Sequence, residues 1–168
     1  AELEKLGVKA VYSVFNVEEM AQVEQGVASI ASQLGGIDIL INNAGVGDFG
    51  SFEEMPVETW EKVMKVNLFG VYYVAKATLP YLKQNKEGDI VNVASTAGLK
   101  GAPNMSAYCA SKAAVISLSQ SLMAELRKFN IRVITLTPST IATDMSIEGK
   151  LTDGNPEKVL QPEDFAEW

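Results

Sequence analysis

Apolar segments of this chain alternate with amphipathic ones, and the alternation predicts strands and helices in turn. Residues 18–34 carry apolar side chains every three or four positions, which is typical of one helix face, and Gly35-Gly36 follow as a stop signal. Longer helical stretches are predicted over 56–84, with Pro80 kinking or closing the helix, and over 107–129. We expect strands in the apolar runs 8–14, 37–41, 89–94 and 131–137. Strands that alternate with helices are typical of an α/β fold with a doubly wound parallel sheet, covered on both faces.

Length and composition predict one globular domain over residues 1–168, because 47% of the residues are apolar and 21% are charged. The 14 basic and 21 acidic residues give a net charge of −7, which disfavours nucleic acid as a partner. The apolar runs are too short to cross a bilayer, so we expect no membrane partner. A single cysteine, Cys109, rules out a disulfide framework and favours a reducing compartment, which we take to be the cytoplasm.

The chain has no histidine, so proton chemistry falls to other side chains, and we expect no metal site. Tyr108 and Lys112 stand four residues apart in a predicted helix and therefore share one face. Ser95 follows a predicted strand, which places it at the sheet edge where ligands of parallel sheets bind. A cation about 4 Å away can move a phenol pKa from about 10 toward 7, which makes this tyrosine a workable proton donor. The spacing alone is common, and a half-buried tyrosine beside an extended lysine is the plainer alternative.

Further motifs occur in order around these three residues. They are Asn42-Asn43-Ala44-Gly45 after a strand, Asn67 within a helix, Ser95, Tyr108-Cys109-Ala110-Ser111-Lys112, and Pro138 with Ile141-Ala142-Thr143. In order, spacing and context this set resembles the short-chain dehydrogenase/reductase family over nearly the whole chain. The resemblance implies a Rossmann-like fold and hydride transfer between a nicotinamide cofactor and a carbonyl compound or alcohol.

The resemblance also implies roles for individual residues. Tyr108 would be the general acid, Lys112 would lower its pKa and bind the nicotinamide ribose, and Ser95 would bind the substrate carbonyl. Asn67, which distorts its helix, would support a water relay to Lys112; a simple kink-stabilising role is the alternative. The other implied cofactor contacts are Asn16 and Val17 near adenine, Asn43, Ala44 and Gly45 at the adenosine ribose, and Ile141 and Thr143 at the carboxamide.

Some positions depart from the family pattern. Asn16 stands where an acidic residue is usual, although its amide oxygen can still accept a hydrogen bond, and Ser139 replaces a glycine after Pro138. The glycine-rich turn that binds the cofactor diphosphate has no counterpart in this sequence. We therefore expect this turn, and further elements at both ends of the fold, in a longer protein. Two more asparagines have structural alternatives: Asn42 bracing the sheet and Asn92 linking strands.

Within the family, Ser95-Thr96-Ala97-Gly98 and the segment 138–145 look most like bacterial 3-oxoacyl-acyl-carrier-protein reductases. The resemblance thus implies an NADP(H)-dependent ketone reductase acting on a small carbonyl compound, either free or attached to acyl carrier protein; NAD(H) is the alternative cofactor. Candidates for contact with such a carrier are Lys100, Arg127, Lys128 and Arg132, for which a solvated surface is the plainer interpretation. Two other hypotheses are a cofactor-free binding or oligomerisation module and an alcohol dehydrogenase working in the oxidative direction.

The helices at 56–84 and 107–129 are apolar around much of their circumference. Such helices usually pack on a second partner besides their own sheet. We expect a homodimer or homotetramer through these two helices, with aggregation of exposed faces as the competing explanation.

Overall fold

The computed structural model describes residues 2–166, and its centre is a parallel sheet of three strands in the order β1-β2-β3. Ile41 of the first strand pairs with Val91 of the second, which pairs in turn with Ile134 of the third. The strands are β1 (Ile39–Asn42), β2 (Gly88–Val93) and β3 (Ile131–Leu136). Their carboxyl ends lie at one edge of the sheet, as expected for a ligand-binding α/β fold.

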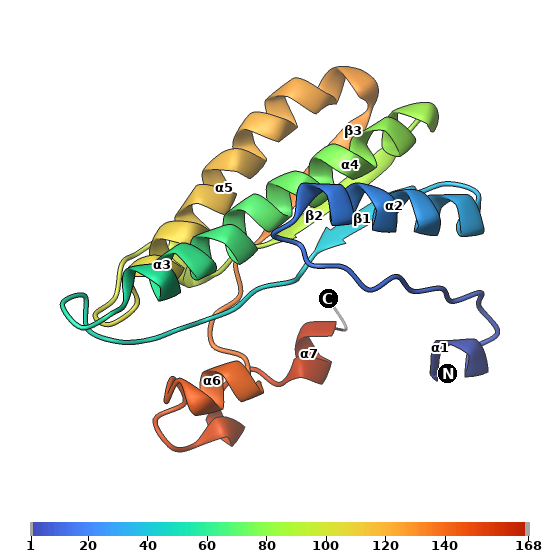
Figure 1. Ribbon diagram of the computed structural model, residues 1–168. Helices are drawn as coiled ribbons and strands as arrows, with labels where there is room; N and C mark the ends of the chain where they lie inside the picture. Colours follow the sequence, from blue (N-terminus) through green and yellow to red (C-terminus); the bar gives the residue numbers. More distant parts are fainter. Residues whose placement is uncertain (1, 167–168) are drawn as a thin grey trace.

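One face of the sheet carries the long helices α2 (Met20–Leu34), α4 (Val71–Gln84) and α5 (Ser106–Leu126), as Figure 1 shows. Leu82 of α4 and Leu126 of α5 belong to one buried cluster with residues of β2 and β3. The strand residues of that cluster include Ile90 and Val133, which are register partners and so point to the same face. Burial of this apolar cluster therefore fixes both helices on one side of the sheet.

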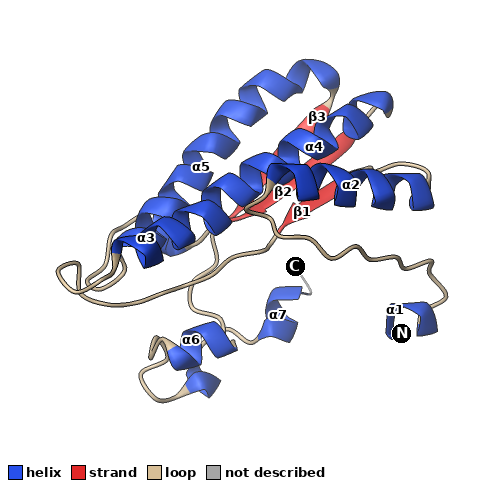
Figure 2. Cartoon of the chain, viewed as in Figure 1, coloured by secondary structure: helices blue, strands red, loops and turns tan. Residues whose placement is uncertain are grey.

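The opposite face of the sheet carries no helix within residues 2–166 (Figure 2). Side chains at alternate strand positions point there, and Ile41 and Ile134 are 62% and 42% exposed. The predicted α/β class and parallel sheet are confirmed. The predicted cover of helices is present on one face only in the described part of the chain.

The strand predicted at residues 8–14 is wrong. Residues 8–16 are irregular, and Tyr12 and Val14 are 86% and 91% exposed. A strand persists only where a neighbouring backbone accepts its hydrogen bonds. Among residues 2–166 the sheet ends at β1, which pairs with β2 alone, so the apolar alternation of 8–14 has no partner.

The long helix predicted over 56–84 forms in three parts. The helix α3 (Val57–Met64) leads into a π-helical turn (Lys65–Gly70), and α4 follows without a break. The distortion predicted around Asn67 is thus confirmed. Pro80 does not close the helix, because α4 continues past it to Gln84.

The other predicted helices agree with the structure within two residues at each end. Residues 18–34 become α2, which ends where Gly35 takes a left-handed conformation, with φ 88°. Residues 107–129 become α5 with a closing 3₁₀ turn at Arg127–Phe129. None of the described helices is long and apolar enough to cross a membrane. The remaining helical segments are α1 (Glu2–Lys5), α6 (Asp144–Glu148), α7 (Pro162–Ala166) and the 3₁₀ turns Thr96–Gly98 and Pro156–Lys158.

Candidate active site

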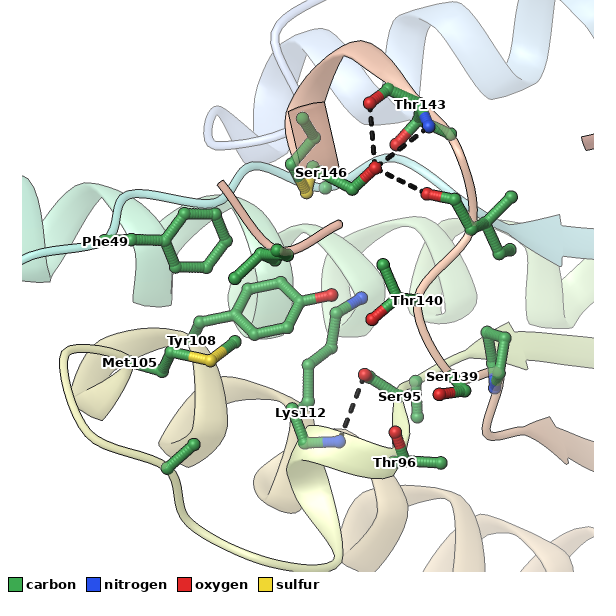
Figure 3. A pocket seen from close by; sticks show the side chains of 18 of the residues that line it. Phe49, Ser95, Thr96, Met105, Tyr108, Lys112, Ser139, Thr140, Thr143 and Ser146 are labelled. Carbon is green, nitrogen blue, oxygen red and sulfur yellow. Dashed lines mark hydrogen bonds between the residues drawn. The ribbon is translucent and has the colours of Figure 1, made fainter. Parts of the chain in front are cut away.

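A cavity of about 710 Å³ opens at the carboxyl ends of β2 and β3. Figure 3 shows Ser95, Tyr108 and Lys112 meeting in it, as the sequence predicts. The predicted residues that line this cavity are Asn43, Gly45, Ser95, Tyr108, Lys112, Ile141 and Thr143. Asn16, Val17, Ala44 and Asn67 do not line it.

Ser95 is held by a tight turn at the end of β2. Its hydroxyl oxygen accepts a hydrogen bond from the Ala97 N–H at 3.1 Å, which caps the 3₁₀ turn Thr96–Gly98. A Cβ on Gly98 would lie 2.7 Å from the carbonyl carbon of Lys112, closer than packing permits. Glycine at this position lets the serine turn touch the backbone of α5 beside the other two site residues.

Lys112 is buried, with 5% of its surface exposed, and its ammonium donates a hydrogen bond to the Val93 carbonyl oxygen at 2.8 Å. Its Nζ lies 5.7 Å from the centre of the Tyr108 ring. Burial lowers the pKa of Lys112 to about 8, because the charged form loses hydration. The charge of Lys112 therefore changes just above neutral pH.

Tyr108 is half-buried in the first turn of α5. Burial raises its pKa above the ordinary value, and the nearby Ser95 hydroxyl opposes this effect more weakly. Burial outweighs any lowering, so the net shift is upward, and the predicted lowering of this pKa by Lys112 stays a prediction. Tyr108 consequently keeps its proton at neutral pH, the state that a proton donor needs.

Asn67 uses its side chain to hold the loop that follows β1. Its amide oxygen accepts a hydrogen bond from the Val46 N–H at 2.8 Å, and its amide nitrogen donates to the Val46 carbonyl oxygen at 2.9 Å. The same nitrogen donates to the Ser111 hydroxyl at 3.0 Å. Asn67 thus positions the loop from the π-helical turn, while its predicted part in a water relay stays a prediction.

The structural interpretation of the strand asparagines is confirmed. The Asn42 side-chain amide donates to the Asn92 amide oxygen at 2.8 Å, and Asn92 donates to the Ser119 hydroxyl at 2.8 Å. All three side chains are buried. This chain of hydrogen bonds ties β1 and β2 to α5 and gives each of the three buried side chains a hydrogen-bond partner.

Ile141 and Thr143 are positioned by a serine that the sequence analysis missed. The Ser146 hydroxyl lies 2.6 Å from the Ile141 carbonyl oxygen and accepts a hydrogen bond from the Thr143 N–H at 3.0 Å (Figure 3). Ser146 is 5% exposed and sits in the first turn of α6. The Thr-x-x-Ser spacing before a short helix is the capping signal by which Ser146 could have been found.

The predicted adenine contacts are only partly brought together. Val17, Asn43 and Ala44 line a second cavity of about 170 Å³, and Val17 packs on Gly70 of the π-helical turn. Asn16 does not line this cavity. Its amide oxygen accepts a hydrogen bond from the Glu18 N–H at 3.0 Å, so it caps the turn into α2.

The two cavities suit the two ends of a dinucleotide. Asn43 lines both of them, so a ligand that extends past this residue reaches each cavity. A Cβ on Gly45 would lie 3.3 Å from the Asn67 amide oxygen and 3.6 Å from Lys112 Nζ. The backbone at Gly45 therefore packs closely against both side chains. The Lys112 ammonium has donors left after its bond to Val93. These residues fit the nicotinamide cofactor that the resemblance implies, and no group of three potential metal ligands of the His, Cys, Asp or Glu type occurs within residues 2–166.

Comparisons with known sequences agree with these motifs. The family model described as short chain dehydrogenase matches residues 1–153. A protein of Xanthobacter autotrophicus named inactive 2-(S)-hydroxypropyl-CoM dehydrogenase 2 is 41% identical over 143 residues, which are 84% of this chain and 62% of that protein. The 3-oxoacyl-(acyl-carrier-protein) reductase FabG of Thermotoga maritima is 38% identical over 148 residues, 88% of this chain and 58% of the reductase. The chain thus spans 62% and 58% of the lengths of these two relatives.

Solved structures give the same result. A short-chain type dehydrogenase/reductase from Mycobacterium marinum has a TM-score of 0.90 and 29% identity, covering 99% of this chain and 69% of that one. An NAD⁺-bound xylitol dehydrogenase has a TM-score of 0.84 and 35% identity, covering 89% of this chain and 58% of that one. A gluconate 5-dehydrogenase from Burkholderia cenocepacia in complex with NADP and tartrate has a TM-score of 0.83 and 30% identity, with coverage of 86% and 57%. With its motifs, its fold and these relatives in agreement, the chain belongs to the short-chain dehydrogenase family.

Proposed function

We propose that this chain carries the catalytic part of an NADP(H)-dependent reductase that converts a ketone to a secondary alcohol. The observation that carries the proposal is the convergence of Ser95, Tyr108 and Lys112 on one cavity, with Tyr108 in its protonated form. A Tyr108 that keeps its proton at neutral pH is in the form that ketone reduction needs.

A nicotinamide cofactor held by these residues would supply the hydride that the carbonyl carbon takes up. The Ser95 hydroxyl donates a hydrogen bond to the substrate oxygen and stabilises the negative charge that develops on it. Tyr108 then gives its phenolic proton to that oxygen, which leaves the alcohol. The Lys112 ammonium, held by the Val93 carbonyl, stabilises the phenolate that remains.

Several residues would hold the cofactor. Lys112, Asn43 and Gly45 line the larger cavity near Tyr108, and Ile141 and Thr143 line its other wall. Val17 and Ala44 would contact the adenosine end in the smaller cavity. The preference for NADP(H) over NAD(H) is part of the proposal, and it rests on the likeness to reductases of the 3-oxoacyl type.

The substrate would be a small carbonyl compound, either free or attached to acyl carrier protein. The likeness to the FabG reductase of Thermotoga maritima supports this choice, since the name of that protein states this chemistry for it. We place the enzyme in the cytoplasm, in keeping with its single buried cysteine.

We also propose that the enzyme is a homodimer or homotetramer formed through residues 56–84 and 107–129. Phe69, Tyr72 and Met123, which lie on these stretches, are 45%, 40% and 50% exposed. Burial of such side chains against a second copy would stabilise the assembly. Light scattering should give a defined dimer or tetramer, and a broad distribution of masses would indicate aggregation instead.

The test of the proposed function is ketone-dependent oxidation of NADPH, followed by absorbance and compared with NADH. We expect saturable turnover with NADPH and weaker turnover with NADH. If neither cofactor supports turnover and the oligomer is defined, the alternative of a non-catalytic oligomerisation module is favoured. Faster oxidation of secondary alcohols than reduction of ketones at neutral pH would favour the alcohol dehydrogenase.

A further inference from the structure

Phe49 is the aromatic neighbour of the proposed proton donor. The centres of the Phe49 and Tyr108 rings are 5.7 Å apart, and their planes meet at 68°, an edge-to-face contact. Both side chains line the larger cavity. The sequence analysis did not single out Phe49, because a lone aromatic residue in a loop with glycines carries no recognisable motif.

The loop that carries Phe49 is anchored on both sides of the ring. Three residues before it, the backbone of Val46 is held by Asn67 through two hydrogen bonds. One residue after it, the Gly50 N–H donates to the Asn104 carbonyl oxygen at 2.9 Å. The ring is therefore set by fixed backbone rather than by a free loop.

Close packing with α6 defines the ring position further. A Cβ on Gly149, which follows α6, would lie 2.5 Å from two carbons of the Phe49 ring. A Cβ on Gly47 would lie 2.6 Å from the same ring and 3.1 Å from the Met145 sulfur. The loop of Phe49, the helix α5 that carries Tyr108, and the α6 segment thus meet at this one side chain.

The cavity has an apolar side and a polar side. Figure 3 shows Phe49 and Met105 to the left of the Tyr108 ring, and Ser139 and Thr140 to its right. Met145 and Leu151 add apolar lining from the α6 segment. The residues assigned above to the cofactor do not include any of these four apolar side chains, which leaves that side for the substrate.

We propose that Phe49 is a specificity-determining residue that forms an apolar wall beside the Tyr108 ring and selects ketones with one unbranched apolar arm. The inference rests on the proposed function, because it assigns the substrate class of the same site. With the carbonyl oxygen at Ser95 and Tyr108, one arm of the ketone lies along Phe49, Met105 and Met145. Burial of each methylene group there lowers the free energy of the bound state.

The test uses straight-chain methyl ketones of rising length, with hydroxyacetone as the polar counterpart. In the unmodified enzyme, each added methylene should raise kcat/KM about threefold until the wall is filled. Phe49→Ala should reduce that increase to less than about twofold per methylene, whereas Phe49→Leu, which keeps apolar bulk, should retain most of it. Because the increase is a ratio within one variant, partial misfolding or a slower Tyr108 does not change it.

Phe52→Ala is the matched control, since Phe52 lies three residues away, is 80% exposed and does not line the cavity. It should keep the full dependence on chain length. Calorimetry of the same ketones measures how their affinity depends on chain length, independently of turnover. A flat or falling dependence in the unmodified enzyme, or an unchanged one in Phe49→Ala, would overturn the inference while leaving ketone reduction intact. Chain-length-dependent binding without any turnover would instead contradict the proposed function and support the wall.

Discussion

The Lys112 ammonium donates a hydrogen bond to the carbonyl oxygen of Val93, the last residue of β2, at 2.8 Å. Ser95 follows two residues later, so the end of one strand holds the lysine and carries the serine. The two residues therefore keep a fixed relationship to each other that does not depend on a bound ligand. Tyr108, one helical turn before Lys112, completes the site from the other element.

Replacing the buried lysine should stabilise the fold at neutral pH. The pKa of Lys112 is about 8 in the folded protein against 10.5 as its ordinary value, so the unfolded chain binds more protons between these two pH values. Lys112→Met should raise the free energy of unfolding by about 1 to 3 kcal/mol at pH 7, and the gain should disappear above pH 10.5. Denaturant unfolding across this pH range measures the gain in the free energy of unfolding. A gain that stays constant with pH would contradict the lowered pKa of Lys112.

The pH dependence of ketone reduction should follow the same group. As pH rises through about 8, Lys112 loses its charge and stabilises the Tyr108 phenolate less. We expect kcat/KM to fall by about tenfold for each further pH unit. Lys112→Arg, which keeps its charge, should be slower but should lack the fall near pH 8. The same fall in both proteins would assign it to another group.

A methyl group on Gly98 should displace the serine turn. Its Cβ would meet the Lys112 carbonyl carbon at 2.7 Å and the Ala113 nitrogen at 2.8 Å, and backbone atoms cannot move aside cheaply. Gly98→Ala should cost about 1 to 3 kcal/mol of stability. It should also lower kcat more than tenfold, since a misplaced Ser95 no longer meets the substrate oxygen; about 1 Å can cost a hundredfold.

Gly50→Ala is the control for this variant. A Cβ on Gly50 has no neighbour within 4 Å, so this variant should keep normal stability and kcat. Equal behaviour of the two alanine variants, measured by denaturant unfolding and steady-state kinetics, would show that Gly98 is not needed for close packing.

Removing the Asn67 side chain should loosen the loop after β1. Asn67→Ala leaves the Val46 N–H, the Val46 carbonyl and the Ser111 hydroxyl without this partner, and Asn67 is fully buried. We expect a loss of about 2 to 4 kcal/mol and faster amide hydrogen exchange at Val46. Asn85 is only half-buried, and its amide donates to Asp38 and to the Ile37 carbonyl oxygen, so Asn85→Ala should cost less. Unchanged exchange at Val46 would contradict the anchoring role.

The sequence predicted the elements that are defined by local pattern. The helix stripes, the π distortion at Asn67 and the three paired strands follow from residues close together in the chain. The strand at 8–14 failed because strand formation needs a partner backbone, which a local pattern cannot supply. Closure of the helix at Pro80, one of the two outcomes expected there, did not occur for a related reason, since tertiary packing of α4 on the sheet keeps the helix going past it.

Site residues that belong to a sequence motif could be predicted, and the other site residues could not. Ser95, Tyr108 and Lys112 were found from their place after a strand and within one helix turn. Phe49 and Ser146 were missed, because their roles arise only when loops distant in sequence pack together. The raised pKa of Tyr108 also needed the structure, because burial outweighs the hydrogen bond with the Ser95 hydroxyl that would lower it.

Turnover by Tyr108→Phe, with cofactor binding measured in parallel, tests most directly whether Tyr108 is the proton donor. Phenylalanine keeps the ring that contacts Phe49 and removes only the hydroxyl that gives the proton. We predict that kcat for ketone reduction falls by about 10² to 10⁴, while the affinity for NADPH changes less than about twofold. A variant that retains more than about a tenth of the normal kcat would contradict Tyr108 as the proton donor.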